Sequence, residues 1–303
     1  MVGEIRWLKL SISLAILLSL AVVFLSSPPL ATGVISRLDE RDSISANYNL
    51  ASVPERVVSD AKRVSISLFS NNKAAADEFA AQLVSTYITA RDCKVVIIFN
   101  PGGWGWRFVS DSPNWRSIFK GMEEHLRSNS VDAFFLEHRR SNETLQSYVD
   151  EYTAVVGLNS FKAKVFAVRV NFLIEEIPGL KVILTGESNG TVICDEVMKI
   201  LRDSPQVFSI QTGTPFWHAG ETNGRTLIIN NNGGLPDTFA SGDLFTMISR
   251  NVEALLGFSK FDTSQGHILN LFAAPGHTYT WEDPTVRNQI EVFLDRNVIS
   301  PKQ

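Results

Sequence analysis

"KVILTGESNGTVICDEVMKILRDS", residues 181–204, contains a strand pattern, a glycine-flanked serine and a helix pattern in direct succession. Residues 181–186 form a short apolar run with β-branched members, which is typical of a strand buried on both faces. Residues 191–204 place apolar side chains at helical spacing. No loop separates the two patterns, so this stretch predicts a strand that turns at once into a helix, the repeating unit of α/β proteins.

Ser188 is the centre of a Gly-x-Ser-x-Gly motif, with Gly186 and Gly190 two positions away on either side. In so tight a turn, side chains at the glycine positions would collide with their neighbours, and the serine would adopt a strained backbone conformation. Its hydroxyl would then project from the carboxyl end of the strands, where open α/β sheets place their sites. A structural serine in a helix-capping turn is the alternative, but the direct strand-to-helix context favours a nucleophile.

The same alternation of strand and helix extends outward from this stretch in both directions. Apolar runs predict strands at residues 94–100, 132–139, 181–186, 206–213, 225–231 and 267–274. Helical spacing predicts helices at residues 74–92, 114–129, 163–177, 191–204, 243–257 and 284–297. Strands that are apolar throughout are typical of parallel sheets covered by helices on both faces. We therefore expect residues 61–303 to form a single α/β domain with a doubly wound, mostly parallel sheet.

The strand, Gly-x-Ser-x-Gly turn and helix resemble the α/β-hydrolase superfamily of serine esterases and lipases, and the resemblance covers about residues 94–297. That family places an acid after a later strand and a histidine after the last strand. The resemblance implies that His277 in "APGHTYTW" (274–281) is the general base. For the acid, "NGGLPDTFASGD" (232–243) offers Asp237 and Asp243. Asp237 is preferred because a glycine precedes it by three residues, as in the family, whereas Asp243 fits equally well as a helix N-cap.

The resemblance also implies two backbone N–H donors for an oxyanion. One belongs to Asn189, the residue after the expected nucleophile, and the other to Gly103 or Trp104 in "FNPGGWGW" (99–106). This loop departs from the family pattern, because Asn100 and Pro101 stand where a histidine is usual. The choice between the two loop donors stays open.

These residues together predict acyl transfer through a covalent intermediate, with an ester as the expected substrate and a thioester or amide as alternatives. Tryptophans 104, 106 and 217 follow strands at the same edge and suit an apolar or lipid-like acyl or aryl group. His138 and His218 also follow strands there, and we expect them to serve in packing or hydrogen bonding. The competing hypothesis is a catalytically inactive relative that binds a small molecule or a protein. A peptidase is a third alternative.

Composition argues against several other classes of function. A net charge of −4 and the lack of a basic run give no attraction to nucleic acid. The histidines, at positions 125, 138, 218, 267 and 277, show no metal-ligand spacing, so no metal is expected. No phosphate-binding glycine motif accompanies the glycine-rich loop, and no cofactor is expected. The two cysteines, Cys93 and Cys194, are expected to be free.

The N-terminus differs from the rest of the chain. Residues 10–25, "LSISLAILLSLAVVFL", carry no charge and follow Arg6 and Lys9. Their length falls between the apolar core of a signal peptide, about 7–15 residues, and a membrane span of about 20. We favour a membrane-anchoring helix within residues 1–31 that leaves the catalytic domain outside the cytoplasm, with a secreted protein as the alternative. Residues 32–60 are polar and aperiodic, and are expected to be a linker.

Overall fold

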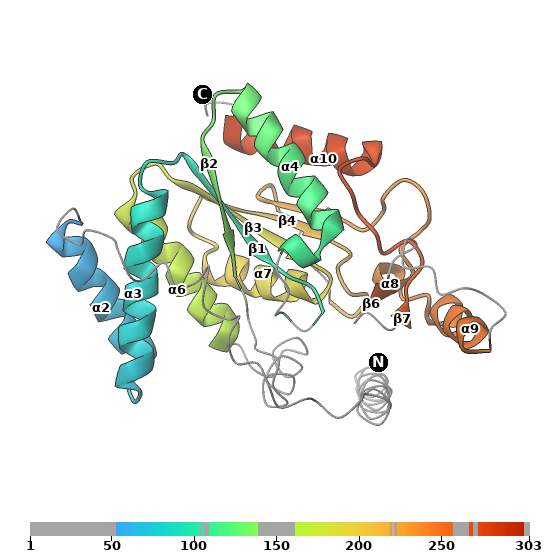
Figure 1. The fold of residues 1–303 in the computed structure, drawn as a ribbon, viewed down its shortest axis with the longest axis horizontal. Helices are drawn as coiled ribbons and strands as arrows, with labels where there is room; N and C mark the ends of the chain where they lie inside the picture. The colour runs from blue at the N-terminus through green and yellow to red at the C-terminus, as the bar shows by residue number, and fades with distance from the viewer. Residues whose placement is uncertain are drawn as a thin grey trace. The chain divides into compact units, whose positions relative to one another are not determined.

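The computed structural model describes residues 53–103, 105, 109–138, 161–218, 220, 223–256, 267–268 and 272–299. Its centre is a five-stranded sheet in which every neighbouring pair is parallel, with the order β2-β1-β3-β4-β5 (Figure 1). The strands are β1 (Val95–Asn100), β2 (Ala133–Glu137), β3 (Lys181–Glu187), β4 (Val207–Thr212) and β5 (Thr226–Ile229). The expectation of an α/β fold with a mostly parallel sheet is confirmed.

Helices connect β1 to β2, β2 to β3 and β3 to β4, and others precede β1 or follow β5. They are α2 (Glu55–Leu68), α3 (Lys73–Ala90), α4 (Pro113–Ser128), α6 (Phe161–Glu176), α7 (Asn189–Ile200), α8 (Thr238–Ser241), α9 (Leu244–Leu255) and α10 (Pro284–Leu294). A short 3-10 turn, η2 (Val109–Asp111), precedes α4, and the π-turn η4 (Asp295–Ile299) continues α10. Each helix expected from apolar spacing is present, with ends that differ by a few residues.

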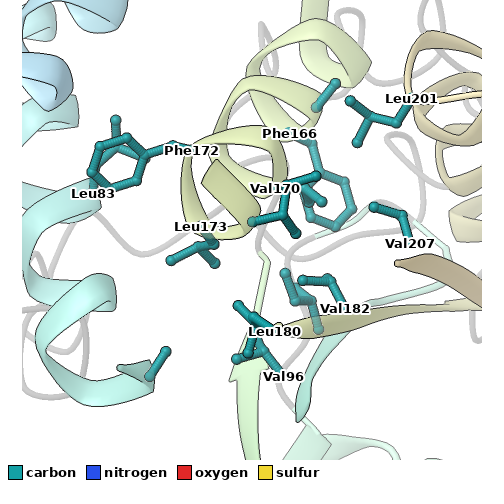
Figure 2. Packing of buried hydrophobic residues seen from close by; sticks show 14 of the residues in the cluster. Leu83, Val96, Phe166, Val170, Phe172, Leu173, Leu180, Val182, Leu201 and Val207 are labelled. Carbon is teal, nitrogen blue, oxygen red and sulfur yellow. The ribbon is translucent and has the colours of Figure 1, made fainter. Parts of the chain in front are cut away.

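Alternate residues of the buried strands face two separate apolar clusters. Val96 and Ile98 of β1 belong to the first cluster, together with side chains from α2, α3, α6 and α7. Figure 2 shows Phe166 and Val170 of α6 close to the strand residues of this cluster. Ile97 and Phe99 belong to the second cluster, which α4 and α10 cover. Because the strands are apolar on both faces, helices cover the sheet on both sides, as Figure 1 shows.

The last expected strand, residues 267–274, is not part of this sheet, so that prediction was wrong. The chain there forms two short strands, β6 (His267–Ile268) and β7 (Phe272–Ala273), which pair with each other in an antiparallel hairpin. The hairpin lies near α8 and α9 in Figure 1, and α9 contacts β7. The residues that follow β7 therefore do not extend from a strand of the parallel sheet, and contacts between loops hold them.

The expected linker also ends earlier than residue 60. Helix α2 begins at Glu55, and its residues Val57, Ala61 and Ser65 are buried at intervals of four. The remaining part of the linker up to residue 52 and the expected N-terminal hydrophobic helix (1–31) lie outside the described residues. Within the described part of the chain, no helix combines the length and apolar character that a membrane crossing requires.

Truncation of the strand core should cost much more stability than truncation of a surface side chain of the same type. Ile98 is 1% exposed in β1, whereas Ile66 on α2 is 61% exposed. Ile98→Ala should lower the free energy of unfolding by about 2–5 kcal/mol because it leaves a cavity between sheet and helices. Ile66→Ala, the matched control, should change it by less than about 0.5 kcal/mol. Urea denaturation followed by circular dichroism measures both, and equal effects would contradict the proposed core.

Candidate active site

Ser188 occupies the sharp turn between β3 and α7. Its backbone has φ 50° and ψ −123°, a conformation that costs a non-glycine residue on the order of 1–3 kcal/mol. Ser188 precedes the first residue of α7, yet its side chain makes no capping hydrogen bond to that helix. Its amide instead donates to Thr212 O at the end of β4, and its carbonyl accepts from Thr191. The expected alternative of a helix-capping serine is therefore not what the geometry shows.

The two glycines of the motif are required by the close approach of backbone. A Cβ at Gly190 would lie 2.3 Å from Asn100 O and 2.8 Å from Pro101 O. A Cβ at Gly186 would lie 2.9 Å from Thr191 Cα. All three distances are shorter than real Cβ contacts allow, and at both positions the obstacle is backbone. Any side chain at these positions would therefore open the turn that holds Ser188.

The glycine-rich loop after β1 runs beside the turn. A Cβ at Gly102 would lie 3.1 Å from Ser188 Cβ, and the next residue, Gly103, has φ +58°. Asn189 Nδ2 donates to Gly103 O at 3.3 Å, which ties the loop to the first turn of α7. Because Asn189 opens the helix, its backbone N–H has no intrahelical carbonyl partner. The structure thus brings Gly103 and Asn189 together next to Ser188, whereas Trp104, the alternative donor, lies outside the described residues.

Asn100, which the sequence comparison set apart because the resembled superfamily usually has a histidine there, has a definite structural role. Its side chain is fully buried, and Nδ2 donates to Gly190 O at 2.6 Å and to Cys194 Sγ at 3.4 Å. Both partners belong to α7. Asn100 therefore fastens the end of β1 to α7, the helix that follows Ser188.

Asp237 and His277 form a buried hydrogen-bonded pair. His277 Nδ1 and Asp237 Oδ2 are 2.7 Å apart, and the two residues are 8% and 1% exposed. The other carboxylate oxygen accepts from the amides of Phe239 and Ala240 at 2.8 and 2.9 Å. Burial alone would raise the pKa of Asp237, but hydrogen bonding to His277, the charge of its imidazole and further hydrogen bonds outweigh burial and lower the pKa. Asp237 therefore stays a carboxylate, as an acceptor for the imidazole requires.

Asp243, the alternative acid, is engaged elsewhere. Its side chain accepts from the amide of Thr246 at 3.0 Å and caps α9. This is the helix-capping role that the sequence offered as its alternative. Of the two aspartates, the structure brings Asp237 to the histidine.

Ser188 and the Asp237–His277 pair meet at the carboxyl end of β4. Thr212, the last residue of β4, accepts the amide of Ser188, and the next residue, Gly213, lies directly against the imidazole. A Cβ at Gly213 would lie 2.4 Å from His277 Cε1 and 3.2 Å from Asp237 Oδ2. No hydrogen bond joins Ser188 Oγ to the imidazole among these described residues. Such bonds are often long in ligand-free enzymes and shorten when substrate binds.

The loops that carry the acid and the histidine are joined to each other by several hydrogen bonds. Thr238 donates to Pro275 O through both its amide and its hydroxyl. Asn232 Nδ2 donates to Thr278 O at 2.7 Å. At Gly276, which has φ +81°, a Cβ would lie 2.3 Å from Pro236 O. We call residues 231–238 and 274–279 together the double loop.

Sequence reasoning missed Tyr279, which also contacts the acid. Tyr279 Oη donates to Asp237 Oδ2 at 2.5 Å, and the tyrosine is 3% exposed. Burial and the charge of Asp237 raise the pKa of Tyr279, so its hydroxyl stays protonated and remains a donor. The spacing of two residues from His277 could have suggested a shared direction, because alternate side chains of an extended segment lie on one face.

Aromatic side chains extend from the imidazole toward the segment after β4. The Phe239 ring lies 5.1 Å from the His277 ring and 5.2 Å from the Trp217 ring, both in edge-to-face geometry. Phe216 continues the series at 5.1 Å from Trp217. Of the three tryptophans expected at this edge, the structure describes Trp217, while Trp104 and Trp106 lie outside the described residues. The described surroundings of His277 are therefore largely apolar on this side.

The other two histidines expected near this edge have structural partners. His218 Nε2 lies 2.7 Å from Oδ2 of the buried Asp195 on α7, and Asp195 Oδ1 accepts from Gln211 of β4. This contact fastens the segment after β4 to α7. His138 stacks on Phe166 with ring centroids 4.0 Å apart. Among the described residues, no group of three or more histidine, cysteine or acidic side chains is arranged to hold a metal ion.

Comparisons with known proteins add little to this geometry. No protein-family model matches the chain, and no curated protein matches it. Among solved structures, the chain is similar to a Trichoderma reesei cutinase in complex with a C11Y4 phosphonate inhibitor. The identity is 14%, the match covers 64% of this chain and 82% of the cutinase, and the TM-score is 0.32.

A side chain at position 213 should displace the imidazole. Gly213→Ala places a Cβ inside the volume of the His277 ring and at φ +62°, so we expect the ring to move away from Asp237. Gly224→Ala is the matched control, because a Cβ at Gly224 meets no atom within 4 Å. NMR of the imidazole Nδ1–H resonance should show its loss or a large shift in Gly213→Ala alone. An unchanged resonance in both variants would contradict the described packing.

The lowered pKa of Asp237 predicts how its contribution to stability depends on pH. A carboxylate with a lowered folded-state pKa stabilises the fold above its ordinary value of 3.8, and this contribution is lost as the pH falls through the folded-state pKa. At pH 7, Asp237→Asn should lower the free energy of unfolding by about 1–3 kcal/mol, because it disrupts a buried charge-assisted network. The difference from wild type should narrow below about pH 4.

Urea denaturation at pH 7 and at pH 3.5 measures this difference. Asp203→Asn, at an exposed position, is the control and should have little effect at pH 7. A difference between Asp237→Asn and wild type that grows toward low pH would contradict the sign of the shift.

Proposed function

We propose that this protein is a serine hydrolase of the α/β-hydrolase type that cleaves a carboxylic ester through an acyl-enzyme. The observation that carries the proposal is the strained, uncapped Ser188 at the same strand edge as a buried Asp237–His277 pair. Strained backbone opposes folding, and so does the removal of an ionisable group from water. Both features are concentrated at functional sites.

In the first step of the proposed mechanism, His277 Nε2 takes the proton of Ser188 Oγ as this oxygen bonds to the carbonyl carbon of the ester. Asp237 accepts the Nδ1 proton, which leaves Nε2 as the basic nitrogen and stabilises the imidazolium that forms. The ester carbonyl becomes an oxyanion. We assign its donors to the backbone N–H of Asn189 and to one N–H of the loop at Gly103 or Trp104, each worth roughly 3 kcal/mol of barrier.

Collapse of the tetrahedral intermediate breaks the bond to the alcohol oxygen, which leaves with the proton from His277 Nε2. Water then enters, and His277 takes one of its protons as the water oxygen attacks the acyl carbon. The second tetrahedral intermediate then collapses and releases the carboxylic acid. Ser188 Oγ leaves the acyl carbon and takes back a proton from His277 Nε2. No cofactor or metal ion takes part in these steps.

The aromatic series beside His277 favours substrates with an apolar or lipid-like acyl or aryl group. Phe239, Trp217 and Phe216 lie in sequence from the imidazole. Apolar groups of a substrate gain binding free energy against such surfaces. The apolar segment at residues 10–25 further suggests that the domain acts while tethered to a membrane on its extracytoplasmic side.

Covalent labelling by a fluorophosphonate tests the proposal on the full chain. Wild type should be labelled, whereas Ser188→Ala should not be labelled at all, because the bond forms at Ser188 Oγ. His277→Ala should react at least about 10³-fold more slowly, because the hydroxyl loses its base.

Two control substitutions should label like wild type: Ser59→Ala on the exposed face of α2, and His125→Ala, whose ring bonds Asp295 on the surface. Equal labelling of wild type, Ser188→Ala and His277→Ala would rule the mechanism out. Failure of every protein to react would favour a binding protein with the same fold.

A further inference from the structure

We propose that Tyr279 is a positioning residue for the reaction: its hydroxyl fixes Asp237 Oδ2 opposite His277 Nδ1 and keeps the carboxylate an acceptor throughout turnover. The inference rests on the proposed function, which assigns the base to His277 and the acid to Asp237. It adds a third side chain to that pair.

The carboxylate of Asp237 is held from two directions. The amides of Phe239 and Ala240 bind Oδ1, and they come from the first turn of α8, which Asp237 caps. These two bonds oppose rotation of the planar carboxylate about the Cβ–Cγ bond through one of its oxygens only. Tyr279 and His277 both bind Oδ2, at 2.5 and 2.7 Å. Tyr279 therefore supplies the restraint that holds Oδ2 in place when the imidazole moves or changes charge.

The tyrosine is itself rigid enough for this task. Its ring belongs to the apolar cluster beneath α4 and α10, and its exposed fraction is 3%. The ring centroid lies 6.1 Å from the His277 ring at an interplanar angle of 83°. Burial and the neighbouring carboxylate raise the pKa of Tyr279, so the phenol stays protonated. The hydroxyl is thus a permanent donor to Asp237.

A second donor at Oδ2 also affects where the proton resides. Hydrogen bonds to a carboxylate stabilise its charged form, and Tyr279 is among the groups that lower the pKa of Asp237. A less basic Asp237 leaves the proton on the imidazole during the reaction, as the mechanism requires. Loss of the phenol would make Oδ2 both less fixed and a stronger acceptor for the imidazole N–H.

The decisive variant is Tyr279→Phe in the full chain, which removes the hydroxyl and keeps the ring. Tyr87→Phe is the matched control: Tyr87 is also buried, and it lies on α3 in the other apolar cluster. The hydrogen bond is present before and during the reaction, so only the part that strengthens in the transition state affects the rate. We expect the rate constant for phosphonylation of Ser188 to fall about tenfold in Tyr279→Phe, with the binding constant of the probe unchanged.

A double-mutant cycle that combines Tyr279→Phe with Asp237→Asn shows whether Tyr279 affects the labelling rate through the carboxylate of Asp237. In the Asp237→Asn background, Tyr279→Phe should have no further effect on labelling, because the charged acceptor is already absent. The same tenfold fall in both backgrounds would show that Tyr279 acts through packing and would overturn the proposal. An unchanged rate in the wild-type background would overturn it as well.

A spectroscopic measurement keeps this test separate from that of the proposed function. The imidazole Nδ1–H resonance, assigned by its loss in His277→Ala, should shift in Tyr279→Phe and stay in place in Tyr87→Phe. This shift does not depend on any reaction at Ser188. If wild type is not labelled at all, the hydrolase proposal fails, while the resonance still decides on Tyr279: an unchanged resonance overturns the positioning role.

Discussion

The backbone of α7 approaches the end of β1 so closely that position 190 has no space for a side chain. This contact determines the path of the turn before it and hence the unusual φ of Ser188. Because the two segments are so close, Asn100 Nδ2 also donates a hydrogen bond to Gly190 O. It further brings the loop at Gly102 beside Ser188 Cβ. The position of the expected nucleophile and that of its glycine-rich neighbour therefore depend on this contact, which Gly190 permits and Asn100 reinforces.

The sheet was predictable because its strands are buried on both faces and their sequences show it. The apolar runs that became β1 and β3 leave no polar face for water, which is how parallel strands between helices appear in sequence. The run at residues 267–274 has the same appearance, yet it folds into the hairpin of β6 and β7. Apolar character does not specify a partner strand, and pairing depends on contacts far away in sequence. Helix α2 was missed because polar residues surround its buried positions at intervals of four.

The residues of the candidate site were predictable where local sequence and their order along the chain identify them. The motif around Ser188 and the position of His277 after an apolar run rest on local sequence, and the structure places both at one strand edge. The choice between Asp237 and Asp243 rested on a glycine three residues before Asp237, and a hydrogen bond now assigns Asp243 to the cap of α9. Tyr279 escaped notice because a tyrosine in a loop is ordinary in sequence and becomes significant only through its distance to Asp237. The catalytic roles of these residues stay predictions until labelling is measured.

The double loop carries the acid and the histidine as one preassembled piece. Its two segments contact each other at Thr238, Asn232 and Gly276, and neither segment is a strand of the central sheet. Ser188, by contrast, is bonded to the sheet itself through Thr212. A rigid-body shift of the double loop would leave the carboxylate–imidazole pair intact and change one separation, that between the imidazole and the serine oxygen. Under the proposed mechanism, a movement of this piece would change the reaction rate through that one separation.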